Sequence, residues 1–361
     1  MTVLGALALL LALTSGLLLL LIGLVVGRKT ARDRAEKRMA NRRRLYAEAV
    51  RGVGGPELEA MMCKVRDDRR AQTDLMIELG RIRIELDAER RHDLASAAEA
   101  SGLAAEAVKQ IGHHNAVVRG HGGLLLARLG TPAAAEYLQI LLHDRDADVR
   151  LVACAGLALA ETRGAARSLA GALRDDRIAP ERIIERLAAR WALEPVLELL
   201  ADETGGDEDS ARFRTHLARV LGLIGDRAAS STLVELLTAG GQEERTNAAR
   251  SLGSAGDETA VAPLVAALGD DAWTVRAQAA RALGRLGGAG EAEPLGALLR
   301  DGAWWVRAAA AAALGEIGPA GHAVLRSALH SPDRFTRDRA SEQLALLELA
   351  ASNGREAPVV A

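Results

Sequence analysis

Residues 270–287 read DDAWTVRAQAARALGRLG, and this stretch decides the fold class. Val275 lies directly before Arg276, Leu283 stands seven residues after that arginine, and Gly287 stands eleven residues after it. Apolar residues at this spacing line one face of a helix of about four turns, and glycine commonly follows a helix end in a left-handed conformation. The stretch therefore predicts one helix with a buried face, closed by a left-handed glycine cap.

The same pattern recurs along the C-terminal two-thirds of the chain, where its arginine returns every 30 to 32 residues. Leucine follows the arginine at +7 in seven of eight copies, glycine follows at +11 in five, and an acid precedes it at −6 in five. A period of this size indicates a stacked repeat protein, and a shorter helical stretch before each acid makes each unit a helix pair. The eight arginines are Arg119, Arg150, Arg182, Arg214, Arg245, Arg276, Arg307 and Arg337.

Residues 141–150, LLHDRDADVR, and residues 270–287 resemble HEAT repeats of the short, phycobilisome-lyase-like type. The acid at −6, the Val-Arg pair and the closing Leu and Gly carry this resemblance. It extends over residues 103–348 and implies an all-α solenoid of about eight helix pairs that offers a long surface to partners. The third copy departs from the pattern, because Ala189 replaces the leucine and Trp191 follows, so we expect an irregularity there.

An uncharged, apolar run from Val3 to Val26 precedes the repeats. At about 1.5 Å per residue, a helix of this length spans about 36 Å, which is enough to cross a bilayer. A cleaved secretory signal is the alternative, but it requires basic residues before the apolar run, and here they follow it. We therefore expect a transmembrane anchor over residues 1–27 in a single-pass protein of the plasma (inner) membrane, with the N-terminus outside and the solenoid cytoplasmic.

The remaining domain organisation follows from changes in charge and periodicity. Residues 28–102 comprise a basic juxtamembrane stalk, which suits anionic lipid headgroups, and helices that cap the first repeat. The HEAT-repeat solenoid covers residues 103–350, and residues 351–361 are predicted to be a disordered tail. Cys63 and Cys154 are the only cysteines and lie far apart, so they predict neither a disulfide nor a metal site. Scarce lysine beside abundant arginine and alanine indicates a GC-rich bacterial source.

The periodic arginines allow two interpretations. They could form a phosphate-binding ladder along one face, or each guanidinium could bond an acid and carbonyls at the turns of its own or the adjacent repeat. Arginine suits partly buried, multidentate hydrogen bonding. Its recurrence beside the acid at −6 favours the structural role.

Positions +2, +5 and +9 of each second helix are not needed for packing, and we expect them on the concave side. In the first four repeats they predict an apolar groove for a partner helix, unless residues 45–100 cover it or the assumed facing is wrong by one residue. In repeats four to six the +5 residues are basic, and they form either a solvated face or a site for an acidic segment. Residues 308–313 of repeat seven are all alanine. The groove residues are Leu124, Val152, Leu159, Ile184, Leu187, Trp191 and Leu223, and the basic ones are Arg219, Arg250, Arg281 and, nearby, Arg285.

Four of the eight aromatic residues gather where the C-terminal second helices begin, at positions −3 and −2. Tryptophan is enriched at binding hot spots, and it also fills turns between repeats, so partner contact and packing both remain open. These residues are Trp273, Trp304, Trp305 and Phe335.

Enzymatic and nucleic-acid motifs are absent from the sequence. The chain lacks the repeated His-Glu pairs of deoxyhypusine hydroxylase, a C-x-x-C, a phosphate-binding loop and G-x-S-x-G. Its net charge is −2, and its arginines lack interleaved aromatics, so no nucleic-acid partner is expected. We expect no catalytic residues, no metal site and no cofactor.

These observations predict a membrane-tethered, non-enzymatic scaffold or adaptor whose cytoplasmic solenoid binds a protein partner. The expected partner is membrane-associated, for example an integral-membrane enzyme such as a polysaccharide-synthesising glycosyltransferase. The alternatives are a HEAT-like lyase or hydroxylase-type enzyme and a nucleic-acid-binding HEAT protein. Nothing in the sequence indicates the oligomeric state.

Overall fold

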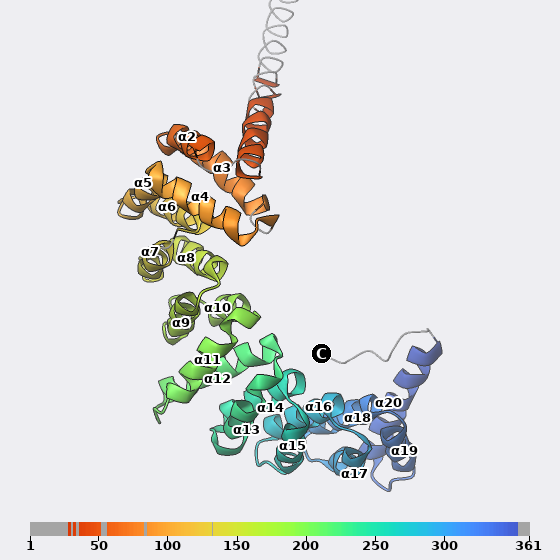
Figure 1. Ribbon diagram of the computed structural model, residues 1–361. Helices are drawn as coiled ribbons and strands as arrows, with labels where there is room; N and C mark the ends of the chain where they lie inside the picture. The colour runs from red at the N-terminus through yellow and green to blue at the C-terminus, as the bar shows by residue number, and fades with distance from the viewer. Residues whose placement is uncertain are drawn as a thin grey trace, which may run out of the picture. The chain divides into compact units, whose positions relative to one another are not determined.

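The computed structural model describes residues 28–29, 32–33, 36–51, 56–82, 85–131 and 133–352, and every regular element in these residues is helical (Figure 1). The chain divides within α7 (Ala134–Leu141) into two compact units. Unit 1 ends at Tyr137, and unit 2 begins at Leu138. The boundaries of the four domains expected from the sequence stay predictions.

Unit 1 places three helices and the helix over residues 36–51 before the first predicted repeat. Within it, α2 and α4 pack against α5, and α3 packs against α6. Its core is made of fully buried aliphatic side chains such as Met62, Leu75, Leu79, Leu94 and Leu103. The labelled helices of this unit before α7 are α2 (Pro56–Arg66), α3 (Arg69–Ile82), α4 (Ala88–Ala100), α5 (Leu103–Ile111) and α6 (Ala116–Leu129).

Unit 2 continues the series of helix pairs, joined in places by short 3-10 turns. One predicted arginine lies on each even-numbered helix from α6 to α20, so the all-α solenoid of eight helix pairs is confirmed. The helices are α8 (Ala147–Ala160), α9 (Arg163–Gly171), α10 (Pro180–Leu187), α11 (Leu193–Asp202), α12 (Glu208–Ile224), α13 (Ser230–Ala239), α14 (Gln242–Ala255), α15 (Val261–Ala267), α16 (Trp273–Leu286), α17 (Ala292–Ala297), α18 (Trp304–Ile317), α19 (Pro319–Ala328) and α20 (Arg334–Ser352).

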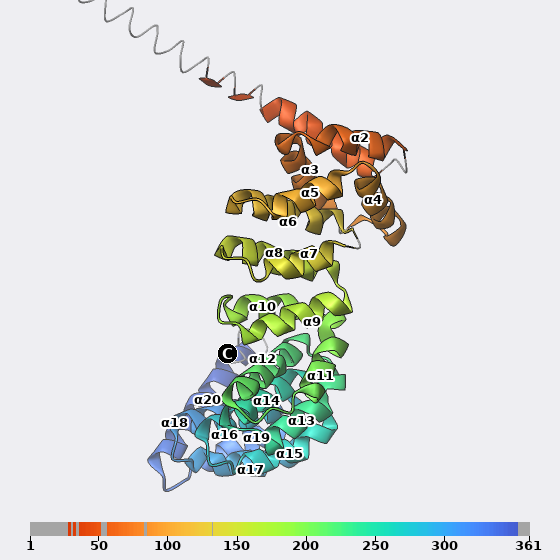
Figure 2. The same cartoon turned by 90° about the vertical axis from the view of Figure 1, so that its left-hand side faces the viewer.

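Within unit 2 the even-numbered helices form one row and the odd-numbered helices form a second row, most clearly from α13 to α20 (Figure 1). Along the even row, α12 contacts α14, α14 contacts α16, α16 contacts α18 and α18 contacts α20. The turned view shows α9 beside α10 as a single layer of the stack (Figure 2). Each helix pair therefore packs mainly on the pair before it and the pair after it, as in other solenoids.

The repeating apolar positions form the core. The leucine at +7 is fully buried in six copies, and the valine at −1 is buried wherever it occurs. In α20, the last described helix, Leu344 is only half-buried. The buried set comprises Leu126, Leu157, Leu221, Leu252, Leu283 and Leu314 with Val118, Val149, Val275 and Val306.

A glycine at +8 allows the even-numbered helices to approach closely. A Cβ atom added to Gly284 of α16 would lie 2.9 Å from Cα of Ala313 on α18, and one added to Gly222 of α12 would lie 2.9 Å from Cα of Ser251 on α14. Contacts this short force a neighbour to move, and here the neighbour is backbone. Glycine is therefore required at these two crossings, of α16 with α18 and of α12 with α14. The four residues at +8 are Gly222, Gly253, Gly284 and Gly315.

The glycines at +11 end the second helices in different ways. Gly130 and Gly225 have the left-handed conformation expected of a cap, whereas Gly318 combines a positive φ of 86° with a ψ of −139° and is not such a cap. Gly256 and Gly287 have φ of −76° instead, so the prediction of a left-handed cap is wrong for them. At these two positions glycine is needed for space, because an added Cβ would lie 2.4 Å and 2.5 Å from the carbonyl oxygens of Leu252 and Leu283.

The third helix pair is irregular, as the sequence predicted. Its second helix, α10, has 8 residues, whereas α14, α16 and α18 each have 14. Positions +3 and +4 carry the exposed Glu185 and Arg186, so the helix buries Ile184 and Leu187 at +2 and +5 in their place. Ile184 and Leu187 are 2% and 0% exposed, and their assignment to an open partner surface is wrong.

The prediction of a single transmembrane helix, and with it a single-pass location in the plasma membrane, is corrected here. Among the residues that the structure describes, no helix is long and apolar enough to cross a membrane. The longest of the labelled helices, α20, has 19 residues and carries charged side chains along its length. The predicted anchor, residues 1–27, and most of the predicted tail, residues 353–361, lie outside the described residues.

Candidate protein-binding surface

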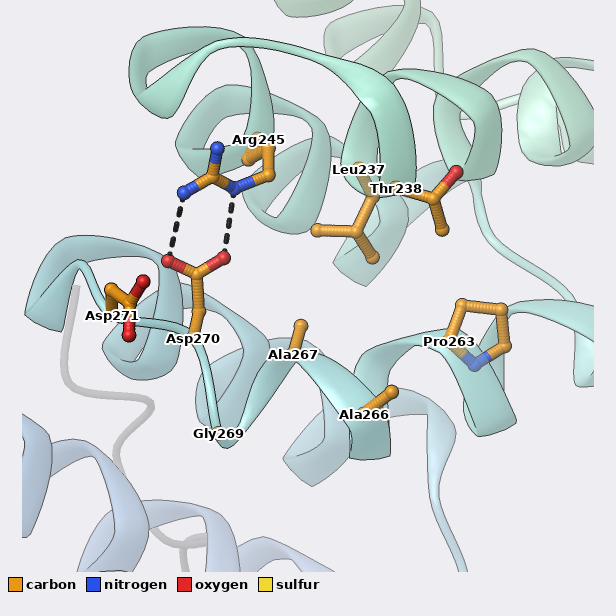
Figure 3. A pocket seen from close by; sticks show the side chains of 9 residues that line it. All are labelled: Leu237, Thr238, Arg245, Pro263, Ala266, Ala267, Gly269, Asp270 and Asp271. Carbon is orange, nitrogen blue, oxygen red and sulfur yellow. Dashed lines mark hydrogen bonds and ion pairs between the residues drawn. The ribbon is translucent and has the colours of Figure 1, made fainter.

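The recurring spacing of arginine and acid has a direct structural basis in unit 2. Arg245 on α14 donates from Nε and Nη2 to the two carboxylate oxygens of Asp270, at 2.8 Å and 3.0 Å, and from Nη1 to the carbonyl of Gly240 at 3.1 Å (Figure 3). Arg276 repeats this with Asp301 at 2.8 Å and 2.9 Å, and also binds the carbonyl of Asp270. Each arginine therefore joins the turn of its own repeat to the acid at −6 of the next.

The other copies vary the same arrangement. Arg214 bonds Glu244 at 2.6 Å, and Arg150 bonds the carbonyl of Arg177 at 2.8 Å, so both still reach the following repeat. The side chain of Arg182 is exposed and, among the described residues, forms neither a hydrogen bond nor an ion pair, in keeping with the rotated α10. The structural interpretation of the arginines is confirmed for most copies, since their guanidinium groups are already occupied.

The carboxylates of this network are held in the ionised form. Hydrogen bonding from Arg245 is the main cause that lowers the pKa of Asp270. At Asp301 burial raises the pKa, but the hydrogen bonds from Arg276 and the backbone of Ala303 outweigh burial, so the pKa is again lowered. Both acids are therefore structural anions at neutral pH.

A surface pocket of about 500 Å³ opens beside the first of these pairs, between α13 and the turn before α16 (Figure 3). Its ionisable groups are Arg245, Asp270 and Asp271, and the first two are bonded to each other. The rest of the lining is small or apolar, with Pro263 and Leu237 among its members. The pocket is a gap between repeats, and the ion pair of Arg245 with Asp270 closes one side of it.

In unit 1 the concave positions of the first repeat are covered by the chain itself. His121 at +2 of α6 contacts Thr73 of α3 at 3.3 Å and Gln110 of α5 at 2.8 Å. At +9, the guanidinium of Arg128 lies against Gly80 of α3. Leu124, at +5 between them, is half-buried. For this repeat, residues 45–100 do cover the face that the sequence assigned to a partner.

The remaining apolar residues do not form one continuous groove in unit 2. Val152, Leu159 and Trp191 are half-buried, and Leu223 is 59% exposed. Because Ile184 and Leu187 belong to the core, the set is interrupted at the third pair. These residues carry no argument for a helix-binding groove.

The predicted basic residues fall into two groups. Arg219 forms an ion pair with Glu181 at 3.5 Å. Arg250 and Arg281, joined by Arg285, have no carboxylate within ion-pair distance among the described residues. Partial burial lowers the pKa of Arg281, and repulsion by Arg250 and Arg285 lowers it further. Three neighbouring guanidinium groups thus have no ion-pair partner in the part of the chain that the structure describes.

The four predicted aromatic residues are all largely exposed on the first turns of α16, α18 and α20. We call this set the aromatic edge. Its exposed fractions are 45% for Trp273, 46% for Trp304, 54% for Trp305 and 61% for Phe335. Trp304 and Trp305 meet edge to face, with ring centroids 4.6 Å apart. Large apolar surface is therefore left in water beside the repeat core.

Two tryptophans of this edge, Trp304 and Trp305, also border a pocket of about 240 Å³, which we call the alanine pocket. The residues Ala308 and Ala312 of α18 line it, so the six-alanine helix, expected to be bare, forms part of a cavity. The structure thus brings the predicted Arg281 and both tryptophans to one place. The other lining residues are Ala309, Ala311, Arg339, Glu342, Gln343 and Leu346.

Helix α20 contributes residues to this pocket that were not predicted from the sequence. Arg339 and Leu346 stand at +2 and +9 from Arg337, which are the same positions that were assigned to the concave face in earlier repeats. The same +2 and +9 positions in the eighth copy therefore identify Arg339 and Leu346 from the sequence. Arg339 places its guanidinium carbon 5.0 Å from the ring centroid of Trp304 and bonds Glu342 at 2.6 Å.

Other candidate chemistry is limited in the described part of the chain. No group of three or more His, Cys, Asp or Glu residues there could hold a metal ion. Burial raises the pKa of the Cys154 thiol to about 11, which leaves it a core residue rather than a nucleophile.

In the predicted basic stalk, Arg42 and Arg43 pair with the buried Asp74 of α3 at 2.9 Å and 3.4 Å. The lipid contact expected of the stalk stays a prediction.

Two overlapping segments, residues 193–284 and 236–315, match the sequence family described as HEAT repeats. The description names no subtype, so the phycobilisome-lyase-like type stays a prediction. No curated protein matches the chain.

Several solved structures match the chain at low identity and low TM-score. Human deoxyhypusine hydroxylase in complex with glycerol is 22% identical over 68% of this chain and 96% of its own, with a TM-score of 0.30. An engineered protein is 19% identical over 81% and 98%, with a TM-score of 0.28. Kap95p, solved with RanGDP, is 13% identical over 83% of this chain and 52% of its own, with a TM-score of 0.47.

At these identities and TM-scores the solved structures carry no argument about function. The family match covers α11 to most of α18, where the arginine pairs and the +8 glycines are most regular. Residues 193–315 thus match HEAT repeats, and they belong to a longer all-helical succession of helix pairs.

Proposed function

We propose that this protein is a non-enzymatic scaffold that binds a protein partner through the aromatic edge of its last three helix pairs. The observation that carries the proposal is the exposure of Trp273, Trp304, Trp305 and Phe335 on consecutive second helices. Tryptophan is among the residues most enriched at binding hot spots, and burying such side chains supplies much of the affinity of an interface. HEAT solenoids commonly bind protein partners along such surfaces.

Packing within the repeat explains only part of the aromatic edge. The arginine pairs and the buried leucines already join neighbouring helix pairs at this edge of unit 2. Trp273 has no ring contact or cation–π partner among the described residues and is 45% exposed. A partner that covers the edge would remove this apolar surface from water.

Affinity purification of the full-length protein from its source cells tests the proposal. The wild type and the triple variant Trp273→Ala, Trp304→Ala, Trp305→Ala are compared, with Val117→Ala as the control. Val117 is exposed and stands at −2 of the first repeat, as Trp305 does in the seventh. Loss of three hot-spot side chains is expected to weaken the complex by more than about a hundredfold.

We expect a stoichiometric protein partner with the wild type and with Val117→Ala, but not with the triple variant. The proposal is wrong if no stoichiometric partner is recovered or if the triple variant keeps it with unchanged helicity. Metal analysis and an absorption spectrum of the same sample cover the enzyme alternative, because a lyase or hydroxylase would carry a pigment or a metal ion.

A further inference from the structure

Next to the aromatic edge lie the three unpaired arginines Arg250, Arg281 and Arg285 and the alanine pocket. We propose that these groups together bind an acidic protein segment that carries a large apolar side chain close to its carboxylates. This inference rests on the proposed function, because it names the chemistry of the partner. It adds that the bound segment is acidic and that it inserts a large apolar side chain into the alanine pocket. Neither property follows from the exposed tryptophans.

The charge balance of the site calls for an anion. Arg250, Arg281 and Arg285 lie close enough for mutual repulsion to act on Arg281, which is half-buried. The acids nearby do not neutralise them: Glu342 is bonded to Arg339, and Glu316 acts on Arg285 only from beyond ion-pair distance. A partly buried guanidinium without a carboxylate is costly, so a carboxylate brought by a partner would be bound favourably.

The spacing of the arginines suits a protein segment that crosses the even-numbered helices. Arg250 belongs to α14 and Arg281 to α16, and these helices are direct neighbours. Packed helices lie about 8–10 Å apart, and an extended chain advances about 3.3 Å per residue. Acidic residues about three positions apart would therefore reach successive arginines.

The apolar half of the site lies directly beyond Arg281. Arg281 itself lines the alanine pocket together with Trp304, Trp305 and Leu346. Because α18 has alanine at positions 308–313, its side chains leave room, and the pocket volume of about 240 Å³ can hold one large side chain. An anchor in this pocket would place its neighbouring carboxylate next to Arg281.

The same geometry is less suited to nucleic acid. A base would need an open aromatic face for stacking, but Arg339 lies over the ring of Trp304 at 5.0 Å. Three guanidinium groups also neutralise few phosphates. The alanine-lined cavity favours an aliphatic or aromatic side chain from a protein.

Fluorescence anisotropy with purified full-length protein tests the inference. The first probe is a short labelled peptide with glutamate at every third position followed by tryptophan, and the second replaces that tryptophan with alanine. The third probe is a labelled single-stranded DNA oligonucleotide. The variants are Arg281→Glu, which reverses the central charge, and Ala312→Leu, which fills the pocket. Arg227→Glu is the matched control, because Arg227 is exposed on a 3-10 turn of the odd-numbered row.

We expect the first peptide to bind, and Arg281→Glu to weaken it at least about tenfold while Arg227→Glu changes it less than about twofold. Ala312→Leu is expected to reduce its affinity to that of the alanine peptide, with unchanged thermal unfolding. The inference is overturned if neither peptide binds, if both charge reversals act equally, or if only the oligonucleotide binds with the same dependence on Arg281.

The affinity purification separates this inference from the proposed function. If the tryptophan variant loses the partner but Arg281→Glu keeps it, the result supports the scaffold function and contradicts the proposed site for an acidic segment. If no stoichiometric partner is recovered, the proposed scaffold function is contradicted, whatever the result of the peptide binding experiments. A self-complex detected by light scattering, and abolished by Arg281→Glu, would assign the site to a second copy of the chain and overturn the inference.

Discussion

Arg307 lies over the ring of Phe335, with its guanidinium carbon 5.1 Å from the ring centroid. In the two preceding copies the equivalent arginine pairs with an aspartate of the next repeat. The eighth copy has Ser331 at that position, and the Nε atom of Arg307 is buried without a hydrogen-bond partner among the described residues. An aromatic ring thus replaces the carboxylate at this junction between repeats.

Restoring the acid should strengthen this junction. Ser331 Oγ accepts a hydrogen bond from the amide of Asp333, just as Asp301 Oδ1 accepts one from Ala303. We therefore expect Ser331→Asp to keep that bond, to supply the missing acceptor for Arg307 and to raise the free energy of unfolding by about 1 kcal/mol. Urea unfolding followed by circular dichroism measures the change. Ser331→Asn, which lacks the charge, should gain clearly less, and equal gains would contradict the prediction.

Removing an existing pair should have the opposite effect. In Asp270→Asn the carboxylate that accepts two hydrogen bonds from Arg245 is lost, and both side chains are mostly buried. We expect the free energy of unfolding to fall by about 2 kcal/mol at neutral pH. The adjacent Asp271 is exposed, so Asp271→Asn should cost less than about 0.5 kcal/mol.

The same pair predicts a pH dependence. The pKa of Asp270 is lowered in the folded chain, chiefly by hydrogen bonding from Arg245, so the unfolded chain binds a proton more readily. Its contribution to stability is fully present above the ordinary carboxyl pKa of about 4 and is lost as the pH falls through the lowered, folded value. The stability difference between wild type and Asp270→Asn should therefore shrink below about pH 4. A difference that stayed constant down to low pH would show that the carboxylate charge is not its cause.

Close packing of the second helices predicts a steric cost at the +8 glycines. Gly284→Ala would place a methyl group 2.9 Å from Cα of Ala313, and the backbone of α18 cannot easily move away. We expect a loss of about 1–3 kcal/mol, measured by urea unfolding. Gly290→Ala is the control, because an added Cβ there meets nothing within 4 Å and should be neutral. Equal stability of the two variants would contradict the prediction that α16 and α18 pack too closely for a side chain at position 284.

The two cysteines should differ in reactivity. Cys63 is exposed, whereas Cys154 is buried in the core with its pKa raised to about 11 by that burial. At pH 8 a thiol-reactive dye should label one thiol per native chain rapidly and both thiols only in denaturant. Cys63→Ser should abolish the rapid phase. Rapid labelling that persists in this variant would show that Cys154 is accessible.

The period of the fold could be predicted because it depends on local burial. A residue such as Leu252 or Leu283 is fully buried since one face of its own helix must lie against a neighbour, and that requirement appears in the sequence as fixed spacing. The third copy shows where this reasoning stops. With Glu185 and Arg186 at positions that are usually apolar, α10 turns, and the surface assigned to Ile184 and Leu187 becomes core.

The candidate site could be predicted only in part. The sequence placed Trp304 and Trp305 at the start of a second helix but left packing and partner contact both open, and the structure shows that both side chains are exposed. Cover of the concave face by residues 45–100 was an open alternative in the sequence, but the contact of Thr73 with His121 was not predictable, because the two residues are 48 positions apart and belong to different structural patterns. Pairing of Arg219 with Glu181 likewise depends on side chains from two neighbouring helix pairs.

By itself, the sequence determined the helix pairs, their number and the arginines that join them, because burial and hydrogen bonding recur at a spacing that each repeat must satisfy on its own. Only the tertiary structure decided which guanidinium groups remain unpaired and which alanines line a cavity. Within the described part of the chain Arg281 has no ion-pair partner and Arg245 has one, because ion pairs depend on where the next repeat places its acids. Helix rotation and helix crossing set those positions, and neither is encoded by periodicity alone.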